Sequence, residues 1–265
     1  MRRWLCAAGR VSTSVFPFPA SSPFEGEAPA AIGGPCGLCG VDHAAPLDPV
    51  CATAALQAWW LELSSSSSLL APKLRQAGGK MIAVLVGLDG HGQRVELRGI
   101  SGDLLGVGDV DGCVPSIIRR EDTADLEAHT LAIVQQATAT LDAGVIDGVD
   151  GIDDDDVQRL RQLRKQASRT LMAAMNDAVT LVNRAGREAS LRDVFVGDGI
   201  PSGTADCALP KLLQQANRQG LTVLGVAEAW WGPGLGVGER RHGLLAMPCA
   251  RRCAPILGYL VCDAP

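Results

Sequence analysis

The chain has 265 residues, 47% of them hydrophobic, which is enough for one large domain or two modest ones with a sizeable core. Its formal net charge of −5 argues against a protein coated in nucleic acid. Nine cysteines are an odd number at low density, which disfavours a secreted disulfide framework and favours a reducing, cytoplasmic setting. The apolar run near the N-terminus is too short for a signal-peptide core, and no run reaches the length of a membrane span.

The first hundred residues predict a leader followed by the start of a core. Residues 1–45 are rich in Pro, Gly, Ser and Ala, so we expect a disordered leader. Residues 46–102 predict an opening helix at 49–63, a Ser-rich linker and a β-hairpin. The hairpin is the clearest unit, because two β-rich runs within 80–102 flank the sequence Asp-Gly-His-Gly, which suits a tight turn.

Residues 103–200 predict a helical insert with an acidic loop. Periodic apolar residues indicate helices at 121–142 and 156–183. The aspartates between 142 and 156 lack the spacing of a calcium loop and predict an exposed connection. The first half of the second helix is basic, through Arg159, Arg161, Arg164, Lys165 and Arg169.

Residues 201–265 predict the Cys-bearing α/β remainder of the core. A helix at 206–219 ends at a glycine, and a strand at 221–231 follows. A Gly-rich loop then leads to a short strand at 243–247 and a helix that carries Cys249. The chain therefore predicts an α/β protein whose core is interrupted by the helical insert.

Three cysteines of this last segment are candidate metal ligands. Cys249 and Cys253 are four residues apart, which places both thiols on one face of a helix. Cys207 falls at the start of another helix, where the helix N-terminus favours the thiolate that metals need. Three thiolates are the number of protein ligands that zinc requires, so we expect zinc here. The alternative is three separate buried cysteines that pack as small apolar side chains.

The order of these elements resembles that of zinc-dependent cytidine and adenine deaminases. The resemblance implies a deaminase-like three-layer α/β/α core, built from the hairpin, the Cys helix, the strand and the Pro-Cys helix. The sequence departs from that pattern twice: Leu209 stands where the proton-shuttling Glu is expected, and the second Cys pair is separated by three residues rather than two. Asp206 and Glu228 are the carboxylates placed to take over catalysis, although a helix cap and a strand-end contact are the alternatives for them.

A wider resemblance covers residues 46–262. It rests on LDPVCATAALQAWW, GKMIAVLVGLDGHGQRVELRGISGDLLG, DGCVPSII, GTADCALPKLL, LGVAEAWWG and RRHGLLAMPCARRCAPILGYLV, in this order. Together they resemble the region that precedes the catalytic domain in large bacterial RluA-type RNA pseudouridine synthases. The chain contains no Arg-Leu-Asp, the motif that carries the catalytic Asp of those synthases. The resemblance therefore implies an accessory region, with RNA and a separate pseudouridine synthase domain as expected partners.

Basic and aromatic residues near the cysteines suggest a surface for substrate. Arg251, Arg252 and Lys211 would surround the thiols with positive charge, and Trp230 and Trp231 offer flat rings for stacking a base. The alternative for the tryptophans is a place in the core.

Further cysteines and histidines are weaker candidates. We favour an exposed imidazole over a fourth ligand for His242. Cys36, Cys39, His43 and Cys51 have a loose metal-like spacing within the expected leader, whereas Cys6, Cys113 and Cys262 are expected to be packing residues.

These residues leave three functions open. The leading expectation is a zinc-binding, RNA-associated accessory domain related to RluA-type synthases. The second is a zinc-dependent hydrolase or deaminase that acts on a nucleobase, with Glu228 or Asp206 moving protons. The third is a structural or thiol-redox protein. Whether the chain is an enzyme stays open at this point.

Overall fold

The computed structural model describes residues 23–102, 104, 110–117, 120–146, 154–234 and 241–265. The chain is mixed α/β and divides into two compact units, of which the smaller comprises residues 118–179 and the larger the remainder. Most of the expected acidic loop, at 147–153, lies outside the described residues. Within the described part, no helix combines the length and the apolar character needed to cross a membrane.

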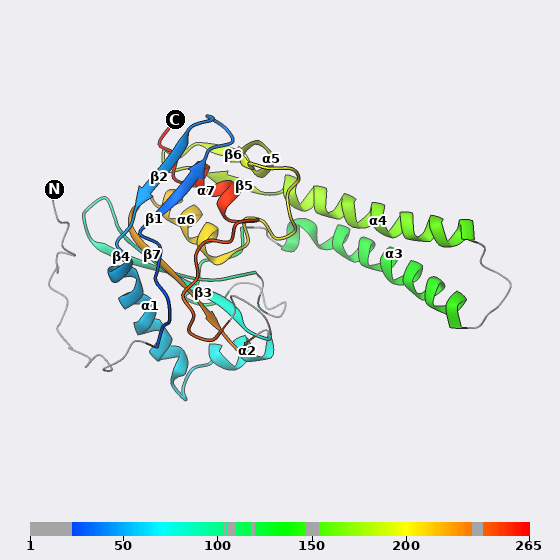
Figure 1. Ribbon diagram of the computed structural model, residues 1–265, viewed down its shortest axis with the longest axis horizontal. Helices are drawn as coiled ribbons and strands as arrows, with labels where there is room; N and C mark the ends of the chain where they lie inside the picture. The colour runs from blue at the N-terminus through cyan, green and yellow to red at the C-terminus, as the bar shows by residue number, and fades with distance from the viewer. Residues whose placement is uncertain (1–22, 103, 105–109, 118–119, 147–153, 235–240) are drawn as a thin grey trace. The chain divides into compact units, whose positions relative to one another are not determined.

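The larger unit is built around a three-stranded antiparallel sheet (Figure 1). Its order is β4–β3–β7, formed by β3 (Lys80–Leu88), β4 (Arg94–Ile100) and β7 (Thr222–Trp231). The first two strands are the predicted hairpin. The Asp89 carboxylate closes their turn, because its Oδ1 accepts the backbone N–H groups of His91 and Gln93 at 2.8 Å each.

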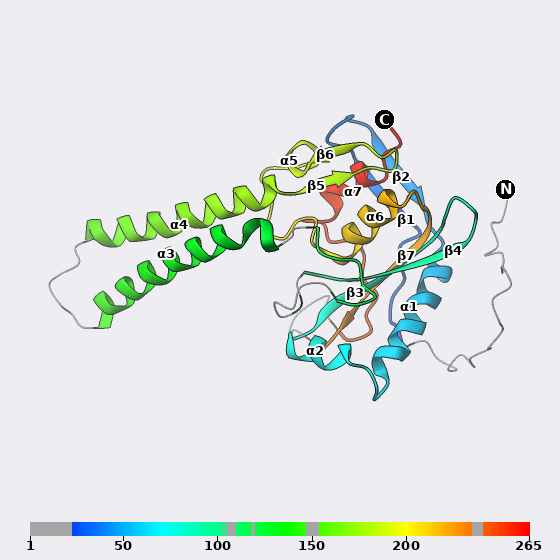
Figure 2. The same cartoon turned by 180° about the vertical axis from the view of Figure 1, so that it is seen from behind.

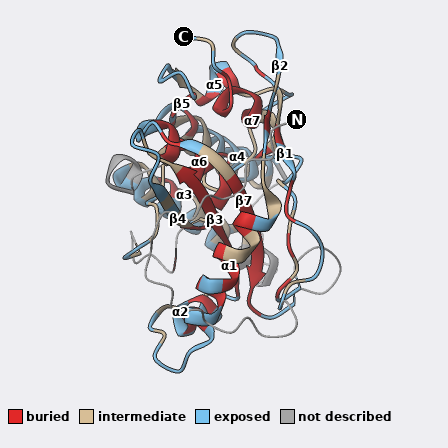
Figure 3. Ribbon diagram, turned by 90° about the vertical axis from the view of Figure 1, so that its left-hand side faces the viewer, coloured by how far each residue is buried: buried red, intermediate tan, exposed pale blue. Residues whose placement is uncertain are grey.

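Helices cover both faces of this sheet. Successive side chains of a strand point to opposite faces, so Ile82, Val84 and Val86 of β3 pack into one core with α1 (Pro49–Ser64). The opposite face packs against α6 (Ala208–Arg218), so closely that a Cβ on Gly99 would lie 3.1 Å from Leu212. Strands β3 and β7, between these helices, are largely buried (Figure 3). The result is a helix–sheet–helix arrangement.

The expected leader is ordered in its second half, which corrects that expectation. Strands β1 (Ala31–Pro35) and β2 (Asp42–Pro46) form an antiparallel hairpin, which packs on α7 (Ala254–Leu260). Gly258 allows this contact, because a Cβ there would lie 2.3 Å from the Pro35 carbonyl oxygen. Tertiary packing against α7 orders a segment whose composition alone suggests disorder.

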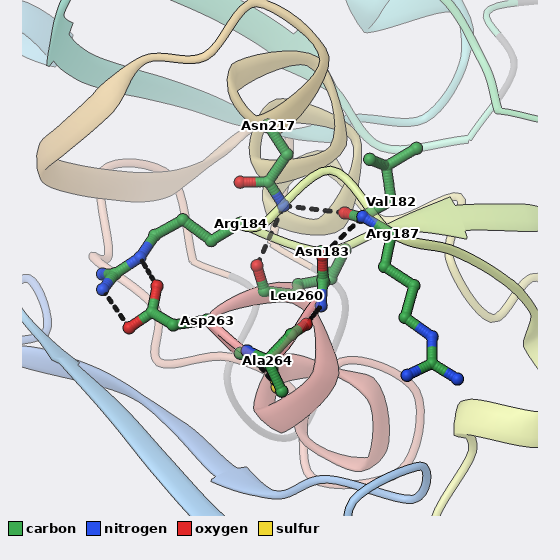
Figure 4. A network of polar contacts seen from close by, with 9 residues as sticks. Val182, Asn183, Arg184, Arg187, Asn217, Leu260, Asp263 and Ala264 are labelled. Carbon is green, nitrogen blue, oxygen red and sulfur yellow. Dashed lines mark hydrogen bonds and ion pairs between the residues drawn. The ribbon is translucent and has the colours of Figure 1, made fainter.

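The end of the expected insert also belongs to the larger unit. Strands β5 (Thr180–Val182) and β6 (Glu188–Ser190) form a hairpin, followed by α5 (Leu191–Val194). The buried Asn217 amide joins this hairpin to the last helix, because its Nδ2 donates to the Val182 carbonyl at 2.8 Å and to the Leu260 carbonyl at 2.9 Å (Figure 4). A short α2 (Leu70–Gln76) follows the Ser-rich linker.

The smaller unit is a helical hairpin. Its helices, α3 (Arg120–Ile146) and α4 (Asp154–Asp177), pack side by side along their lengths (Figure 2). The second helix ends earlier than the predicted residue 183, because the chain turns there into β5. Four of the five predicted basic residues on α4 are exposed, the exception being the half-buried Arg164.

Candidate metal centre

The fold brings together the three cysteines singled out in the sequence. The sulfur atoms of Cys207, Cys249 and Cys253 all lie within 4.8 Å of one another, and those of Cys249 and Cys253 are 3.3 Å apart. Tetrahedral zinc with Zn–S bonds of about 2.3 Å needs sulfur atoms about 3.8 Å apart. The donor set therefore suits a soft divalent metal such as zinc.

Cys207 is positioned by the start of α6. It is the N-cap residue, with extended backbone angles, and the helix begins at Ala208. Ala205, two residues earlier and fully buried, has a φ of 72°, which makes it the one non-glycine with positive φ among the described residues. A left-handed alanine is strained, so the turn that delivers Cys207 is held in place by the packing around it.

Cys249 and Cys253 lie in a turn rather than inside a helix, which corrects the expected position of the pair. Helix α7 begins only at Ala254, and Cys253 is its N-cap residue. The Cys253 N–H points back at Cys249, lying 3.2 Å from its carbonyl oxygen and 3.3 Å from its sulfur. The single backbone turn still brings the two thiols to the same place.

The thiols perturb one another strongly. Hydrogen bonds from Cys207 and Cys253 stabilise the Cys249 thiolate and lower the pKa of Cys249 to about 2. The hydrogen bond to Cys249 raises the pKa of Cys207 to about 12, and contacts with both other thiols raise the pKa of Cys253. Only one of the three ionises readily, because three negative charges repel at this distance. A divalent cation removes that repulsion.

Glu228 approaches the start of α6 from the sheet. It lies on β7 opposite Ala83, on the α6 face, and is only 7% exposed. Its Oε1 accepts the backbone N–H of Leu209 at 3.1 Å. Leu209 is two residues after Cys207, so the strand brings a carboxylate to the backbone of the residue that stands where a Glu was expected from the deaminase resemblance. Burial, together with the Cys249 thiolate, raises the pKa of Glu228 to about 7, against the lowering effect of the Leu209 N–H.

Asp206 and Lys211 hold the loop beside the site. Asp206 Oδ1 accepts the Ser116 hydroxyl at 2.5 Å and lies 3.5 Å from Lys211 Nζ. Lys211 is 3% exposed and also donates to the Gly102 carbonyl at 3.3 Å. The sequence predicted that Lys211 belongs to an exposed basic surface, and its burial shows that this prediction was wrong. The Asp206 carboxylate is already occupied by its contacts with Ser116 and Lys211.

The tryptophans are not available for stacking a base, which corrects that expectation. Trp230 and Trp231 are each 4% exposed. Trp231 packs edge-on against Trp60, with ring centroids 4.4 Å apart. His242 is exposed and is not among the grouped metal ligands of the described residues; its Nδ1 accepts the Gly232 N–H at 3.1 Å.

The three cysteines differ in exposure, and two exposed arginines lie between Cys249 and Cys253 in the sequence. Cys249 is exposed, Cys207 is half-buried and Cys253 is buried, so the three sulfurs form a site that is open on one side. Arg251 and Arg252, between the two thiols of the turn, are both exposed. Whether these two side chains contact a substrate stays a prediction.

Sequence reasoning identified only three members of a second group of metal-type ligands. Cys36, Cys39, His43 and Cys262 have ligand atoms that all lie within 4.8 Å of one another. The Cys-x₂-Cys-x₃-His spacing was the available signal, but Cys51 was the wrong fourth member, since it lies in the core on α1. Cys39 Sγ is 3.0 Å from His43 Nε2, and this contact lowers the pKa of Cys39 to about 6.

Comparison with protein-family models, with curated proteins and with solved structures gave no match.

Proposed function

We propose that the protein is a zinc-dependent hydrolase of the deaminase type, which removes the amino group from a nucleobase. The observation that carries the proposal is the contact between the Glu228 carboxylate and the Leu209 N–H, beside three converging thiols. Glu228 of strand β7 would take the role of the Glu that helix α6 lacks at Leu209. The helix–sheet–helix arrangement supports a deaminase-like fold, in which the metal ligands lie at helix starts.

Cys207, Cys249 and Cys253 would hold the metal. A zinc ion with three protein ligands keeps a fourth position for water and increases the acidity of that water. The thiols come from two helix starts, where backbone N–H groups favour negative charge. Since Cys249 faces solvent, substrate would enter on the side of Arg251 and Arg252, whose charge suits the phosphates of a nucleotide or an RNA strand.

Glu228 would carry the proton. In hydrolytic deamination the oxygen of water bonds to the ring carbon, the bond from that carbon to the amino nitrogen breaks, and ammonia leaves. One proton of the water must reach the departing nitrogen. The Leu209 N–H holds Oε1 of Glu228, which leaves Oε2 to accept that proton and to donate it again.

The test is ammonia release and base mass on purified, zinc-loaded protein. Cytosine and adenine would be offered as free bases, nucleosides and short single-stranded RNA. We expect conversion of one of these bases, and we expect Glu228→Gln to lower kcat about 10²–10⁴-fold while zinc content is unchanged. Asp206→Asn is the matched control, since its carboxylate is already engaged. Loss of activity in Asp206→Asn but not in Glu228→Gln would show that Asp206, and not Glu228, transfers the proton. If no base is converted, the proposed hydrolase activity is refuted.

A second candidate is the RNA-associated accessory domain that the RluA-type resemblance implies. The basic side chains of α4 favour it, because most of them are exposed to solvent. One of them, Arg159, forms an ion pair with Asp156 at 3.0 Å. Neutralised phosphates release counterions, so this candidate predicts RNA binding that weakens steeply with salt. Arg161→Glu combined with Lys165→Glu should then weaken RNA binding without changing zinc content. Unchanged binding at low salt would exclude α4 as the contact surface.

A further inference from the structure

A second set of ligands lies apart from the site described above. We propose that Cys36, Cys39, His43 and Cys262 form a closed, structural zinc centre that joins the N-terminal hairpin to the end of the last helix. Four protein ligands of the Cys₃His type are a common composition of structural zinc sites, which keep no position for water. Their ligand atoms all lie within 4.8 Å of one another, although one of them is 219 residues away from its nearest partner in sequence.

The turn between β1 and β2 is shaped to present three of the ligands. The Gly40 N–H donates to the Cys36 carbonyl at 2.9 Å, and the Cys36 N–H donates to the Val41 carbonyl at 3.0 Å. Gly40 has a φ of 72°, which a glycine adopts without strain. Gly37 lies so close to α5 that a Cβ would be 2.6 Å from a carbonyl oxygen there. The turn is therefore fixed before any metal binds.

The fourth ligand is delivered by the last helix. Cys262 lies two residues after the end of α7, is 2% exposed, and its sulfur accepts the Ala264 N–H at 3.4 Å. Polar contacts hold the flanking residues: the Asn183 amide donates to the Ala264 carbonyl at 2.7 Å, and Arg184 pairs with Asp263 (Figure 4).

The donor chemistry selects the metal. Three thiols and one imidazole are soft and borderline ligands, which disfavour magnesium and calcium and suit zinc. Cys36 and Cys262 are buried while Cys39 and His43 are more accessible, so metal enters from one side and is then shielded on the other. A disulfide between two of the thiols is the competing use of the same cysteines, and it is distinguishable by mass.

The position of this centre gives it a role. Helix α7 has Cys253 immediately before its first residue and Cys262 two residues after its last, so the two ligand groups lie at its opposite ends. Fixing one end of this seven-residue helix restrains the turn at the other end, which carries Cys249 and Cys253. The closed centre would thus hold the open centre in shape.

Metal content of the full chain tests the proposal. Protein purified under reducing conditions from zinc-supplemented cells should carry two zinc ions per chain. Cys39→Ser should carry one fewer, and this substitution disturbs little packing because Cys39 is exposed. His43→Cys should keep two, since Cys₄ is also a zinc set. Cys113→Ser, outside both groups, is the matched control and should keep two.

The outcomes separate this proposal from the hydrolase. If the open centre binds no metal, wild type carries one zinc, which Cys249→Ser retains and Cys39→Ser loses; the closed centre then stands alone. Equal metal content in wild type and Cys39→Ser would overturn the closed centre. So would iron with acid-labile sulfide, or an intact mass two hydrogens lighter with Cys36 or Cys39 linked to Cys262.

Discussion

Glu228 predicts a pH dependence of stability that a single substitution should abolish. Burial raises its pKa to about 7, compared with 4.5 for an ordinary Glu. Below about pH 4.5 the carboxyl is protonated in both the folded and the unfolded chain, and the protein has its full stability. As the pH rises, the unfolded chain loses this proton first, so unfolding becomes easier until the folded carboxyl also ionises near pH 7.

The expected magnitude follows from that difference. About 2.5 pKa units, at about 1.36 kcal/mol for each unit, correspond to a loss of about 3 kcal/mol between pH 4.5 and 7. Glu228→Gln keeps the acceptor for the Leu209 N–H and has no proton to lose. The two proteins should therefore be equally stable near pH 4, and the Gln variant should be more stable above pH 7 by up to about 3 kcal/mol.

Urea unfolding between pH 4 and 8 measures this difference. The background should be Cys207→Ser/Cys249→Ser/Cys253→Ser, because a bound metal would favour the carboxylate and hide the effect. Burial, the largest cause of the raised pKa, remains in that background. Glu96→Gln, which replaces an exposed carboxylate on the same sheet, is the control. Parallel pH profiles with and without Glu228 would refute the assignment of a buried carboxyl that stays protonated near neutral pH.

Three further substitutions test the surroundings of the site. Ala205→Val should destabilise by about 2 kcal/mol or more in urea unfolding, because a β-branched residue tolerates a φ of 72° poorly, whereas Ala205→Gly should cost little; equal effects would contradict a strained turn. Lys211→Met should cost about 3 kcal/mol by leaving Asp206 without its buried cation, and adding Asp206→Asn should recover part of it; additive losses would show that the pair is not coupled. Trp231→Phe should lower the free energy of unfolding by less than about 1.5 kcal/mol, because the indole N–H has no hydrogen-bond partner among the described residues; a loss as large as that of Trp60→Ala, about 3–5 kcal/mol, would indicate a missed partner.

Local patterns predicted the elements that dominate the fold. The hairpin of β3 and β4, the strand β7 and helices α1 and α6 all appear within a few residues of their expected bounds. Each is encoded by its own periodicity and by turn or cap residues, such as Asp89 at the hairpin. The hairpin of β1 and β2 was missed because its segment is rich in glycine and proline, and its order comes from packing on Gly258 of α7.

The candidate site was predictable where ligands are close in sequence and unpredictable where the topology supplies the partner. Cys249 and Cys253 are four residues apart in the sequence, and Cys207 lies at a helix start. All three could therefore be predicted as candidate metal ligands. The buried tryptophans could not be separated from exposed ones by sequence, since β7 buries both of its faces between helices.

The least local relationship is the one between α7 and the two ligand groups at its ends. The spacing of Cys253 and Cys262 does not indicate that they belong to separate ligand groups. Cys253 meets Cys207 only when α6 packs beside this helix, and Cys262 meets its partners only when the β1–β2 hairpin does. Burial of Leu257 and Tyr259 fixes the helix between them. Disrupting the hairpin turn should therefore impair the distant Cys249 turn, even though no ligand is shared, since both turns depend on the position of the same seven residues.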